Sequence, residues 1–371
     1  MTGNTTETTG NSTTETTDTA RELVIAGSGV AGLSAAVYAA RGDLDPVVLE
    51  GDEPGGQLTL TTDVENYLGF PEGVGGMELV QRGREQAEQF GAEFRRATIE
   101  SAALDDRPFE LSLSNGETIR TRALVVATGA SARWVGAENE DELMGYGLST
   151  CATCDGAFHR GDDVLVVGGG DSAMEEALFL ARFAESVTVV HRRDELRASE
   201  ILAQRALDHE DVEIRWNSEL VELHGSQEEG LTGAKLVSHP DGYPAEKYEK
   251  CDDGKYDDED GAGEDGENAE VEDAEAADLE VEDVEAGGVF YAVGHVPNTA
   301  FLRETPVELD ADGHVETRDD TATTVDGVFA AGDVMDPRYR QAITAAGTGS
   351  MAALDAEEWL DVQQLEAVAV Q

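Results

Sequence analysis

Short apolar runs and helical patterns alternate along the chain, and the first group of them surrounds a glycine-rich turn. An apolar run at 23–26 leads into Gly-Ser-Gly-Val-Ala-Gly at 27–32, and a helical stretch follows over 33–41. A second apolar run, 46–49, ends in Glu50. The order of strand, glycine turn, helix, strand and acid predicts a dinucleotide-binding unit. In such a unit the glycines let the backbone approach a pyrophosphate, and the acid accepts a hydrogen bond from a ribose hydroxyl.

The same pattern restarts further along the chain with a different ending. An apolar run at 163–167 leads into Gly-Gly-Gly-Asp-Ser-Ala at 168–173, a helix over 174–183 and a strand over 186–190. That strand ends in His191-Arg192-Arg193, and Arg197 follows. Arginines form charge-assisted, often bidentate bonds to a phosphate, whereas an acid would repel it. The first turn therefore suits FAD or NAD, and the second suits NADP.

The alternative for this basic cluster is a solvated face balanced by Asp194, Glu195 and Glu200. In a chain with a net charge of −54, three arginines and a histidine close together favour a phosphate site.

Other segments extend the α/β pattern. Residues 109–113 and 118–126 alternate around Asn115-Gly116, which predicts a hairpin, and 77–90 has helical spacing. The remaining predicted elements are helices over 201–209 and 342–354 and strands over 212–216, 220–223, 289–293 and 328–332. The expected fold class is α/β, with two Rossmann-like dinucleotide-binding domains of three-layer ββα architecture.

Between the two glycine turns lies Cys151-Ala-Thr-Cys154-Asp155. This spacing can close a small, reducible disulfide, and Asp155 is near enough to move protons. Half of a structural zinc site is the alternative, but the third cysteine, Cys251, lies in an acidic run and His159 does not fit a usual finger spacing. The pattern favours redox chemistry with no metal.

Length and charge set the outer limits. The 371 residues allow about two to three domains, and no apolar run approaches the roughly 20 residues of a membrane span. Without the basic and apolar regions of a signal peptide, a soluble, cytoplasmic protein is expected. The net charge is −54, only 25 residues are basic, and four of those are lysine. Nucleic acid is therefore not expected as a partner, since no basic stripe exists to bind it.

Two segments depart from the folded pattern. Residues 1–20 are half threonine without apolar periodicity, and residues 241–288 carry 21 acids with almost no large apolar side chains. The tail and an insertion over about 241–277 are expected to be disordered.

The motifs Cys-Ala-Thr-Cys-Asp, His-Arg-Arg with its trailing Arg, Gly-Gly-Gln-Leu at 55–58, Ala-Gly-Asp-Val-Met-Asp at 331–336 and Arg-Gln-Ala at 340–342 stand in one order. In this the chain resembles the low-molecular-weight thioredoxin reductases from about residue 21 to 360. The resemblance implies an FAD domain of 21–132 and 289–371, interrupted by an NADPH domain of 133–288. Hinges would lie near 130–133 and 287–291, and the family usually forms homodimers.

The resemblance also implies the ligand-binding residues. For FAD they are Gly27, Ser28, Gly29, Val30, Ala31, Glu50, Gly56, Gln57, Asn66, Thr128, Gly129, Asp333, Arg340, Gln341 and Ala342. For NADPH they are Gly168, Gly170, Asp171, Ser172, Ala173, His191, Arg192, Arg193 and Arg197.

The implied activity is electron transfer from NADPH through FAD and the disulfide to thioredoxin. Cys154 would face the flavin, Cys151 would attack the protein substrate, and Asp155 would serve as acid and base. A disulfide reductase acting on a glutaredoxin-like or peroxidase partner would look the same in sequence. A dithiol oxidase would share the CxxC without needing the arginines.

The charge generates a first prediction. A surface loaded with carboxylates repels itself unless salt screens it, as in halophiles. We expect the melting temperature to fall steeply as KCl is diluted, followed by circular dichroism. An unchanged melting temperature in dilute buffer would contradict the interpretation.

Overall fold

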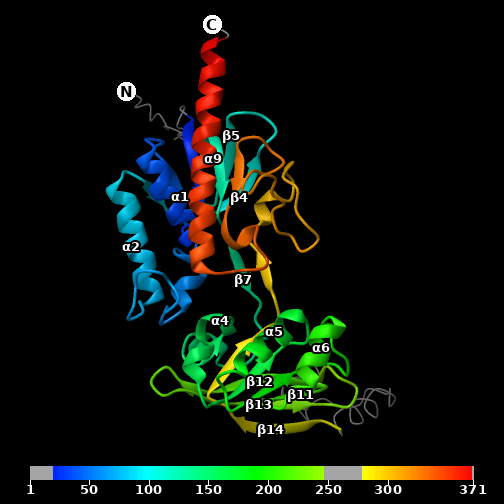
Figure 1. Cartoon of the computed structure of the whole chain (residues 1–371). Helices are drawn as coiled ribbons and strands as arrows, with labels where there is room; N and C mark the ends of the chain where they lie inside the picture. Colours follow the sequence, from blue (N-terminus) through cyan, green and yellow to red (C-terminus); the bar gives the residue numbers. More distant parts are fainter. Residues whose placement is uncertain (1–19, 246–277, 370–371) are drawn as a thin grey trace, which may run out of the picture. The chain divides into compact units, whose positions relative to one another are not determined.

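A computed structural model describes residues 20–245 and 278–369 (Figure 1). The threonine-rich tail up to residue 19, most of the acidic insertion (246–277, with Cys251) and residues 370–371 lie outside the described residues. Two compact units emerge. The first comprises the chain up to Thr59, Met77–Ala130 and the chain from Pro297 onward, and the second comprises Leu60–Gly76 and Ser131–Val296.

A seven-stranded sheet forms the middle of the first unit, in the order β3-β2-β1-β6-β5-β4 with β17 also joined to β6. The strands β3, β2, β1, β6 and β17 are parallel. Strands β5 and β6 form the antiparallel hairpin expected around Asn115-Gly116, and β4 pairs antiparallel with β5. The bounds are β1 Arg21–Ala26, β2 Val47–Leu49, β3 Glu93–Arg95, β4 Ile99–Ala103, β5 Phe109–Leu113, β6 Thr118–Val126 and β17 Val328–Ala330.

Alternate side chains of this sheet enter two separate cores, as the period of a strand requires. Leu23 and Ile25 pack with helices α1 (Val30–Arg41) and α9 (Ala342–Ala369), which lie side by side in Figure 1. Val24 and Ala26 pack on the other face with β5 and the segment after residue 300. The predicted ββα layering is therefore confirmed in this unit. The other helices are α2 (Gly76–Gln89) and the single turns η1 (Gly56–Leu60), η3 (Ala300–Leu302) and η4 (Gly332–Val334).

The second unit repeats the arrangement with a five-stranded parallel sheet, β11-β10-β9-β15-β8. Helices α5 and α6 cover one face, and a three-stranded antiparallel sheet, β12-β13-β14, covers the other. The strands are β8 Leu148–Ser149, β9 Asp163–Val167, β10 Ser186–Val190, β11 Val212–Arg215, β12 Ser218–Ser226, β13 Gly230–Ser238, β14 Glu280–Glu285 and β15 Gly288–Tyr291. The helices are α3 Glu140–Leu143, α4 Ala152–Asp155, η2 Gly156–His159, α5 Asp171–Leu180 and α6 Glu200–Leu207.

The chain crosses between the units four times. The last two crossings lie in β7 (Ala130–Ala132) and β16 (His295–Pro297), which pair with each other. The first of these two lies between Ala130 and Ser131, and the domain boundary expected at 132 stays a prediction. The second lies at Val296, not at 288, because β15 belongs to the second unit's sheet, where it pairs with β9 and β8. Residues 288–291 form strand β15 within that sheet and are not a crossing between the units. The segment Leu60–Gly76, which was expected in the first domain, groups with the second unit.

The structure contains strands that the sequence pattern did not predict. Strand β14 is largely polar and acidic, yet it pairs with β13 from Ser238↔Glu280 to Gly233↔Glu285. The ends of the acidic stretch are thus brought together on neighbouring strands. Residues 241–245, which were expected to be disordered, are described and pack onto the second unit.

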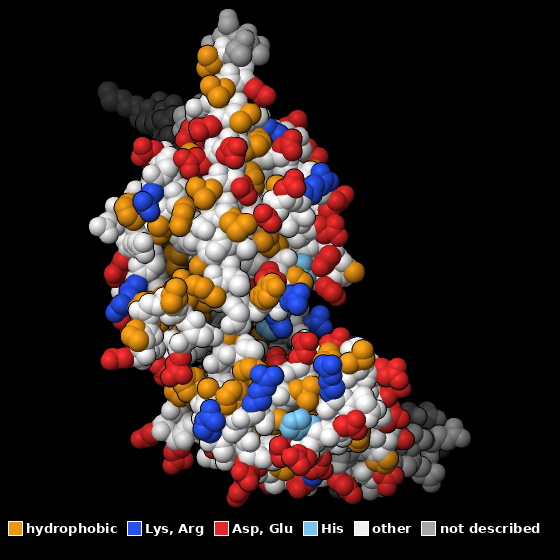
Figure 2. Space-filling model, in the orientation of Figure 1, with side chains coloured by type: hydrophobic (Ala, Val, Ile, Leu, Met, Phe, Trp, Pro, Cys, Tyr) orange, Lys and Arg blue, Asp and Glu red, His pale blue; other side chains and the backbone are white. Residues whose placement is uncertain are grey.

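The surface has the expected acidic character. Figure 2 shows Asp and Glu side chains spread over the visible face of each unit, with fewer Lys and Arg between them. No helix within the described ranges has both the length and the apolar character needed to cross a bilayer.

Two glycines of α9 give a matched test of the packing between α1 and α9. A Cβ on Gly349 would lie 2.1 Å from the Ala31 carbonyl oxygen, whereas a Cβ on Gly347 would have nothing within 4 Å. We expect Gly349→Ala to lower the free energy of unfolding by about 1–3 kcal/mol through overpacking. Gly347→Ala should raise it by about 0.4–1 kcal/mol, because alanine loses less backbone entropy in a helix. Urea unfolding in concentrated KCl measures both, and equal effects would refute the close contact.

Candidate nucleotide and disulfide sites

The carboxyl ends of four parallel strands meet at one edge of the first unit's sheet. Gly27 follows β1 and donates its N–H to the Leu49 carbonyl at 2.8 Å, directly before Glu50. The turn after β6 begins at Ala127, and η4 follows β17. Such an edge is where α/β sheets bind nucleotides. The topology therefore gathers first-unit residues that are far apart in the sequence.

The glycine turn fits a bound pyrophosphate. Gly27 has φ of +107°, and a Cβ there would lie 2.2 Å from the Ala127 carbonyl oxygen, so the two backbones touch. A Cβ on Gly29 would find only the Gly55 carbonyl oxygen, at 3.8 Å. The Ser28 hydroxyl accepts a hydrogen bond from the Gly55 N–H at 3.0 Å, which fixes the neighbouring loop. The first glycine thus closes the turn while the second leaves an open approach.

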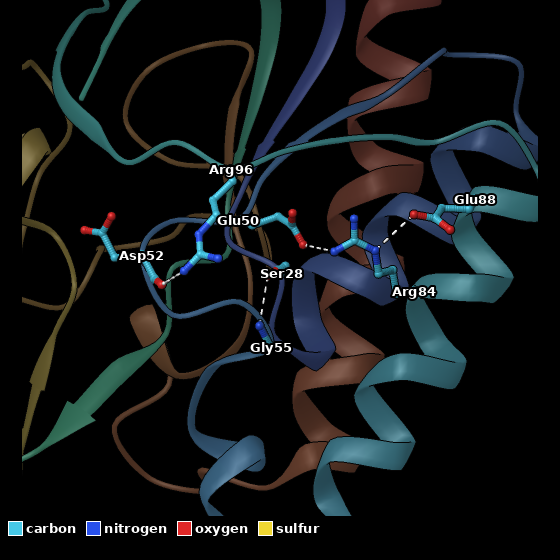
Figure 3. A network of polar contacts seen from close by, with 7 residues as sticks. All are labelled: Ser28, Glu50, Asp52, Gly55, Arg84, Glu88 and Arg96. Atoms are coloured by element: carbon cyan, nitrogen blue, oxygen red, sulfur yellow. Dashed lines mark hydrogen bonds and ion pairs between the residues drawn. The ribbon is translucent and has the colours of Figure 1, made fainter. Parts of the chain in front are cut away.

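The expected ribose acceptor, Glu50, is buried and paired (Figure 3). Its carboxylate forms an ion pair with Arg84 of α2, and the Arg84 Nε–H donates to Glu88 at 3.0 Å. The Arg84 guanidinium also lies 4.5 Å from the centroid of the Phe94 ring. A buried carboxylate needs such a partner, since an uncompensated buried charge is costly. No sequence motif includes Arg84, because its pairing with Glu50 depends on where α2 packs.

The loop that follows Glu50 is also held by a hydrogen bond. The Arg96 guanidinium donates to the backbone carbonyl of Asp52 at 3.1 Å (Figure 3). Hydrogen bonds therefore hold the backbone both before Glu50, at Leu49, and after it, at Asp52.

At the end of β17, Asp333 is a half-buried carboxyl. Burial raises the pKa of Asp333 to about 6, and the nearby Asp336 carboxylate adds to this while Arg340 opposes it. A carboxyl that is poorly solvated gains from a hydroxyl donor, so this position suits a ligand carrying hydroxyl groups.

The structure brings most of the expected FAD residues into the first unit. These are Gly27, Ser28, Gly29, Val30, Ala31, Glu50, Gly56, Gln57, Thr128, Gly129, Asp333, Arg340, Gln341 and Ala342. Asn66 belongs to the second unit instead, with the rest of the segment Leu60–Gly76.

The second glycine turn lies at the matching edge of the second unit. A Cβ on Gly168 would lie 2.6 Å from the Ala292 carbonyl oxygen, and one on Gly169 would lie 2.2 Å from the His191 ring. The Arg197 N–H donates to the Gly169 carbonyl at 2.7 Å. A Cβ on Gly170 would find nothing within 4 Å. The space next to Gly170 is thus open to a ligand. Around it lie the glycine turn, the start of α5 at Asp171 and the His-Arg-Arg run.

His191 is the buried member of the basic cluster. Burial lowers its pKa, and the charges of Arg193, Arg192 and Arg197 lower it further. Its Nε2 lies 2.8 Å from the Glu195 carbonyl oxygen, which can only accept, so Nε2 carries the proton of a neutral ring.

The arginines are not balanced by the acids next to them in sequence. In the ranges that the structure describes, Asp194, Glu195 and Glu200 form no ion pair with Arg192, Arg193 or Arg197. Among the carboxylates that the structure describes, only Glu219 lies in ion-pair range of these arginines, at 3.9 Å from Arg192. The cluster therefore keeps positive charge beside the glycine turn.

Cys151 and Cys154 form a disulfide with their Cα atoms 5.3 Å apart. The pair follows β8, an edge strand of the second unit's sheet, and spans the start of α4. Asp155 ends α4, and burial raises its pKa. The Ser149 hydroxyl donates to the Asp155 carboxylate at 2.5 Å and accepts the Cys151 N–H at 3.0 Å. Ser149 thus joins the disulfide backbone to the acid, and the sequence reading did not single it out.

The zinc alternative can be compared only with the described residues, which do not include Cys251. Among the residues described, no group of three or more His, Cys, Asp or Glu side chains is arranged to hold a metal ion. His159 instead lies 3.4 Å from Asp162 and contacts the Phe290 ring edge-on.

Comparisons with known proteins agree with this geometry. A family model described as pyridine nucleotide-disulphide oxidoreductase matches residues 21–252 and 255–349. The chain belongs to this family. It is 44% identical to the thioredoxin reductase of Mycolicibacterium smegmatis, over 94% of this chain and 99% of that protein. It is 43% identical to the bifunctional thioredoxin reductase/thioredoxin of Mycobacterium leprae, over 94% of this chain and 68% of that protein.

A solved structure extends the likeness to three dimensions. The thioredoxin reductase of Streptococcus pyogenes matches with a TM-score of 0.78 at 33% identity, over 92% of this chain and 98% of that one. The expected α/β fold and the resemblance to thioredoxin reductases are confirmed, as are an NADPH-dependent disulfide oxidoreductase activity and the cofactors FAD and NADPH.

The raised pKa of Asp333 generates a prediction for the FAD-free protein. A carboxyl whose pKa rises from 3.8 to about 6 on folding binds its proton more tightly in the folded state. Its contribution to stability is therefore lost as pH rises between those values, by on the order of 1–2 kcal/mol. Asp333→Asn should remove this slope from unfolding free energies measured across that range. The exposed Asp312→Asn is the control, and an unchanged slope in Asp333→Asn would contradict the assignment.

Proposed function

We propose that the protein is a thioredoxin-disulfide reductase, which passes electrons from NADPH through FAD and the Cys151–Cys154 disulfide to thioredoxin. The observation that carries the proposal is the disulfide with a half-buried acid beside it, on the same sheet as an arginine-flanked dinucleotide turn. The names of the relatives support thioredoxin as the acceptor, and one relative is a thioredoxin fusion.

The binding residues belong to the proposal. FAD would be held by the first-unit set given above together with Asn66, with Glu50 accepting a ribose hydroxyl bond and Asp333 binding hydroxyls of the flavin's chain. NADPH would be held by Gly168, Gly170, Asp171, Ser172 and Ala173, with its 2′-phosphate on the arginines beside His191. The open approaches at Gly29 and Gly170 support both assignments.

The chain's own groups handle the protons and the thiols. When bound, the two cofactors supply a two-electron reduction that converts the disulfide into two thiols. Asp155, protonated to a higher pH than an ordinary aspartate because it is buried, can give a proton to a leaving thiolate and take it back. Ser149 holds that carboxyl against the cysteine backbone. In this proposal Cys151 attacks the disulfide of the partner and Cys154 faces the flavin.

Three finer features complete the proposal. A homodimer and a cytoplasmic location are both what the resemblance to the thioredoxin reductases suggests. A high-salt environment follows from the charge of −54.

The test is thioredoxin-dependent NADPH oxidation in concentrated KCl, with NADH run alongside. Wild type should prefer NADPH, and Cys151→Ser should abolish turnover, because it removes the thiol assigned to attack the partner and Cys154 can no longer form the disulfide. Asp155→Asn should reduce turnover by on the order of 10²-fold, because the proton donor is lost. Ser186→Ala is a control, since Ser186 makes a similar bond to Asp163 away from the cysteines.

A protein that oxidised NADPH only with other disulfide partners would exclude thioredoxin as the acceptor. Reduction of oxygen by a small dithiol without NADPH would instead identify a dithiol oxidase.

A further inference from the structure

Tyr243 lies against the arginine pair from a segment that the motifs do not include. The Arg193 Nε–H donates to the Tyr243 hydroxyl at 2.7 Å. The guanidinium carbons of Arg192 and Arg193 lie 5.1 and 5.5 Å from the centroid of the Tyr243 ring. One aromatic side chain therefore contacts both arginines, through its face and through its hydroxyl.

The backbone fixes Tyr243 in this position. Its N–H donates to the Arg192 carbonyl at 3.1 Å, and a Cβ on Gly242 would lie 2.8 Å from the same oxygen. The Ala245 N–H donates to the Glu219 carboxylate at 3.0 Å. Tyr243 itself has φ of +50°, which is uncommon for a residue with a side chain. The segment thus docks on the arginine run itself, immediately before the residues that the structure leaves undescribed.

The chemistry of the contact differs from that of other arginines in this chain. Arg84 pairs with Glu50, and Arg215 pairs with Glu282. Within the described residues, Arg193 has no carboxylate in ion-pair range and meets a neutral phenol instead. A phenol orients a guanidinium without cancelling its charge. Because the bond uses Nε, it leaves the two terminal nitrogens to serve a bidentate partner such as a phosphate.

We propose that Tyr243 is a positioning residue that sets the preference for NADPH over NADH, by holding Arg192 and Arg193 ready for the 2′-phosphate. The inference rests on the NADPH site of the proposed function and adds a residue from the edge of the acidic insertion to it. Orienting the two side chains before the nucleotide arrives reduces the rotamer entropy lost on binding.

The alternative is that Tyr243 only anchors the chain leading into the insertion. An anchor would affect the stability of the folded protein or the affinity for both nucleotides alike. A positioning residue acts on the 2′-phosphate alone, so the difference between NADP⁺ and NAD⁺ distinguishes the two roles.

The experiment is calorimetric titration of the FAD-loaded protein with NADP⁺ and with NAD⁺ in one concentrated KCl buffer. Tyr243→Phe keeps the ring and removes the hydroxyl, and it should weaken NADP⁺ binding by about 3- to 10-fold, the effect of one hydrogen bond. Tyr243→Leu should weaken it further, because the cation–π contacts are lost as well. NAD⁺ binding should stay within about twofold in both variants. Tyr146→Phe, on a turn of the same unit, is the matched control.

A double-mutant cycle identifies the route. If Tyr243 acts through Arg193, Tyr243→Phe should have little further effect on NADP⁺ binding in an Arg193→Ala background. An equal loss for both nucleotides, a fully additive cycle or unchanged NADP⁺ binding would each overturn the proposal. Equal affinity of the wild type for NADP⁺ and NAD⁺ would instead overturn the arginine phosphate site of the proposed function. Binding is measured without thioredoxin, so failure to reduce thioredoxin is a separate result.

Discussion

Both units depend on the same close contact between backbones at the carboxyl ends of parallel strands. Gly27 faces the Ala127 carbonyl, and Gly168 faces the Ala292 carbonyl, at distances that leave no room for a Cβ. Neighbouring parallel strands bring their ends to one edge, and a side chain at either glycine would push the turn away from it. The positions of Glu50 and of His191 follow from these contacts, since each ends the strand next to its glycine turn.

Positive charge is scarce in this chain, and the structure uses it in two ways. In the first unit Arg84 compensates the buried carboxylate of Glu50, directly after β2. Arg193 on the second unit meets a phenol, which leaves its charge available. Coulomb interactions with the many surface acids are screened by salt, whereas these short contacts in partly buried positions are screened much less. At both sites the tertiary structure therefore determines the partner of the arginine, Glu50 for Arg84 and Tyr243 for Arg193.

The sequence predicted the parts of the fold that local patterns determine. Both glycine turns, the strands beside them, the hairpin at Asn115-Gly116 and the cysteine pair are all present as expected. Strand β14 was missed because it is acidic and exposed, and its pairing with β13 replaces the apolar alternation that marks most strands. The sequence pattern also placed β15 in the first domain, because only strand pairing shows that it belongs to the second unit's sheet. Arg84, Ser149 and Tyr243 were missed because each acts across a tertiary contact that no local spacing encodes.

The pairing of Ser238 with Glu280 also has a consequence for how this protein can vary in length. The two strand ends lie beside each other in the second unit, so the segment that joins them along the chain has fixed ends. Closing a loop between fixed ends becomes only slowly more unfavourable as residues are added. Additions and deletions at this point are therefore nearly neutral for the fold, provided that they begin after Ala245. The segment after Ala245 is therefore a suitable place to insert a reporter or an affinity tag.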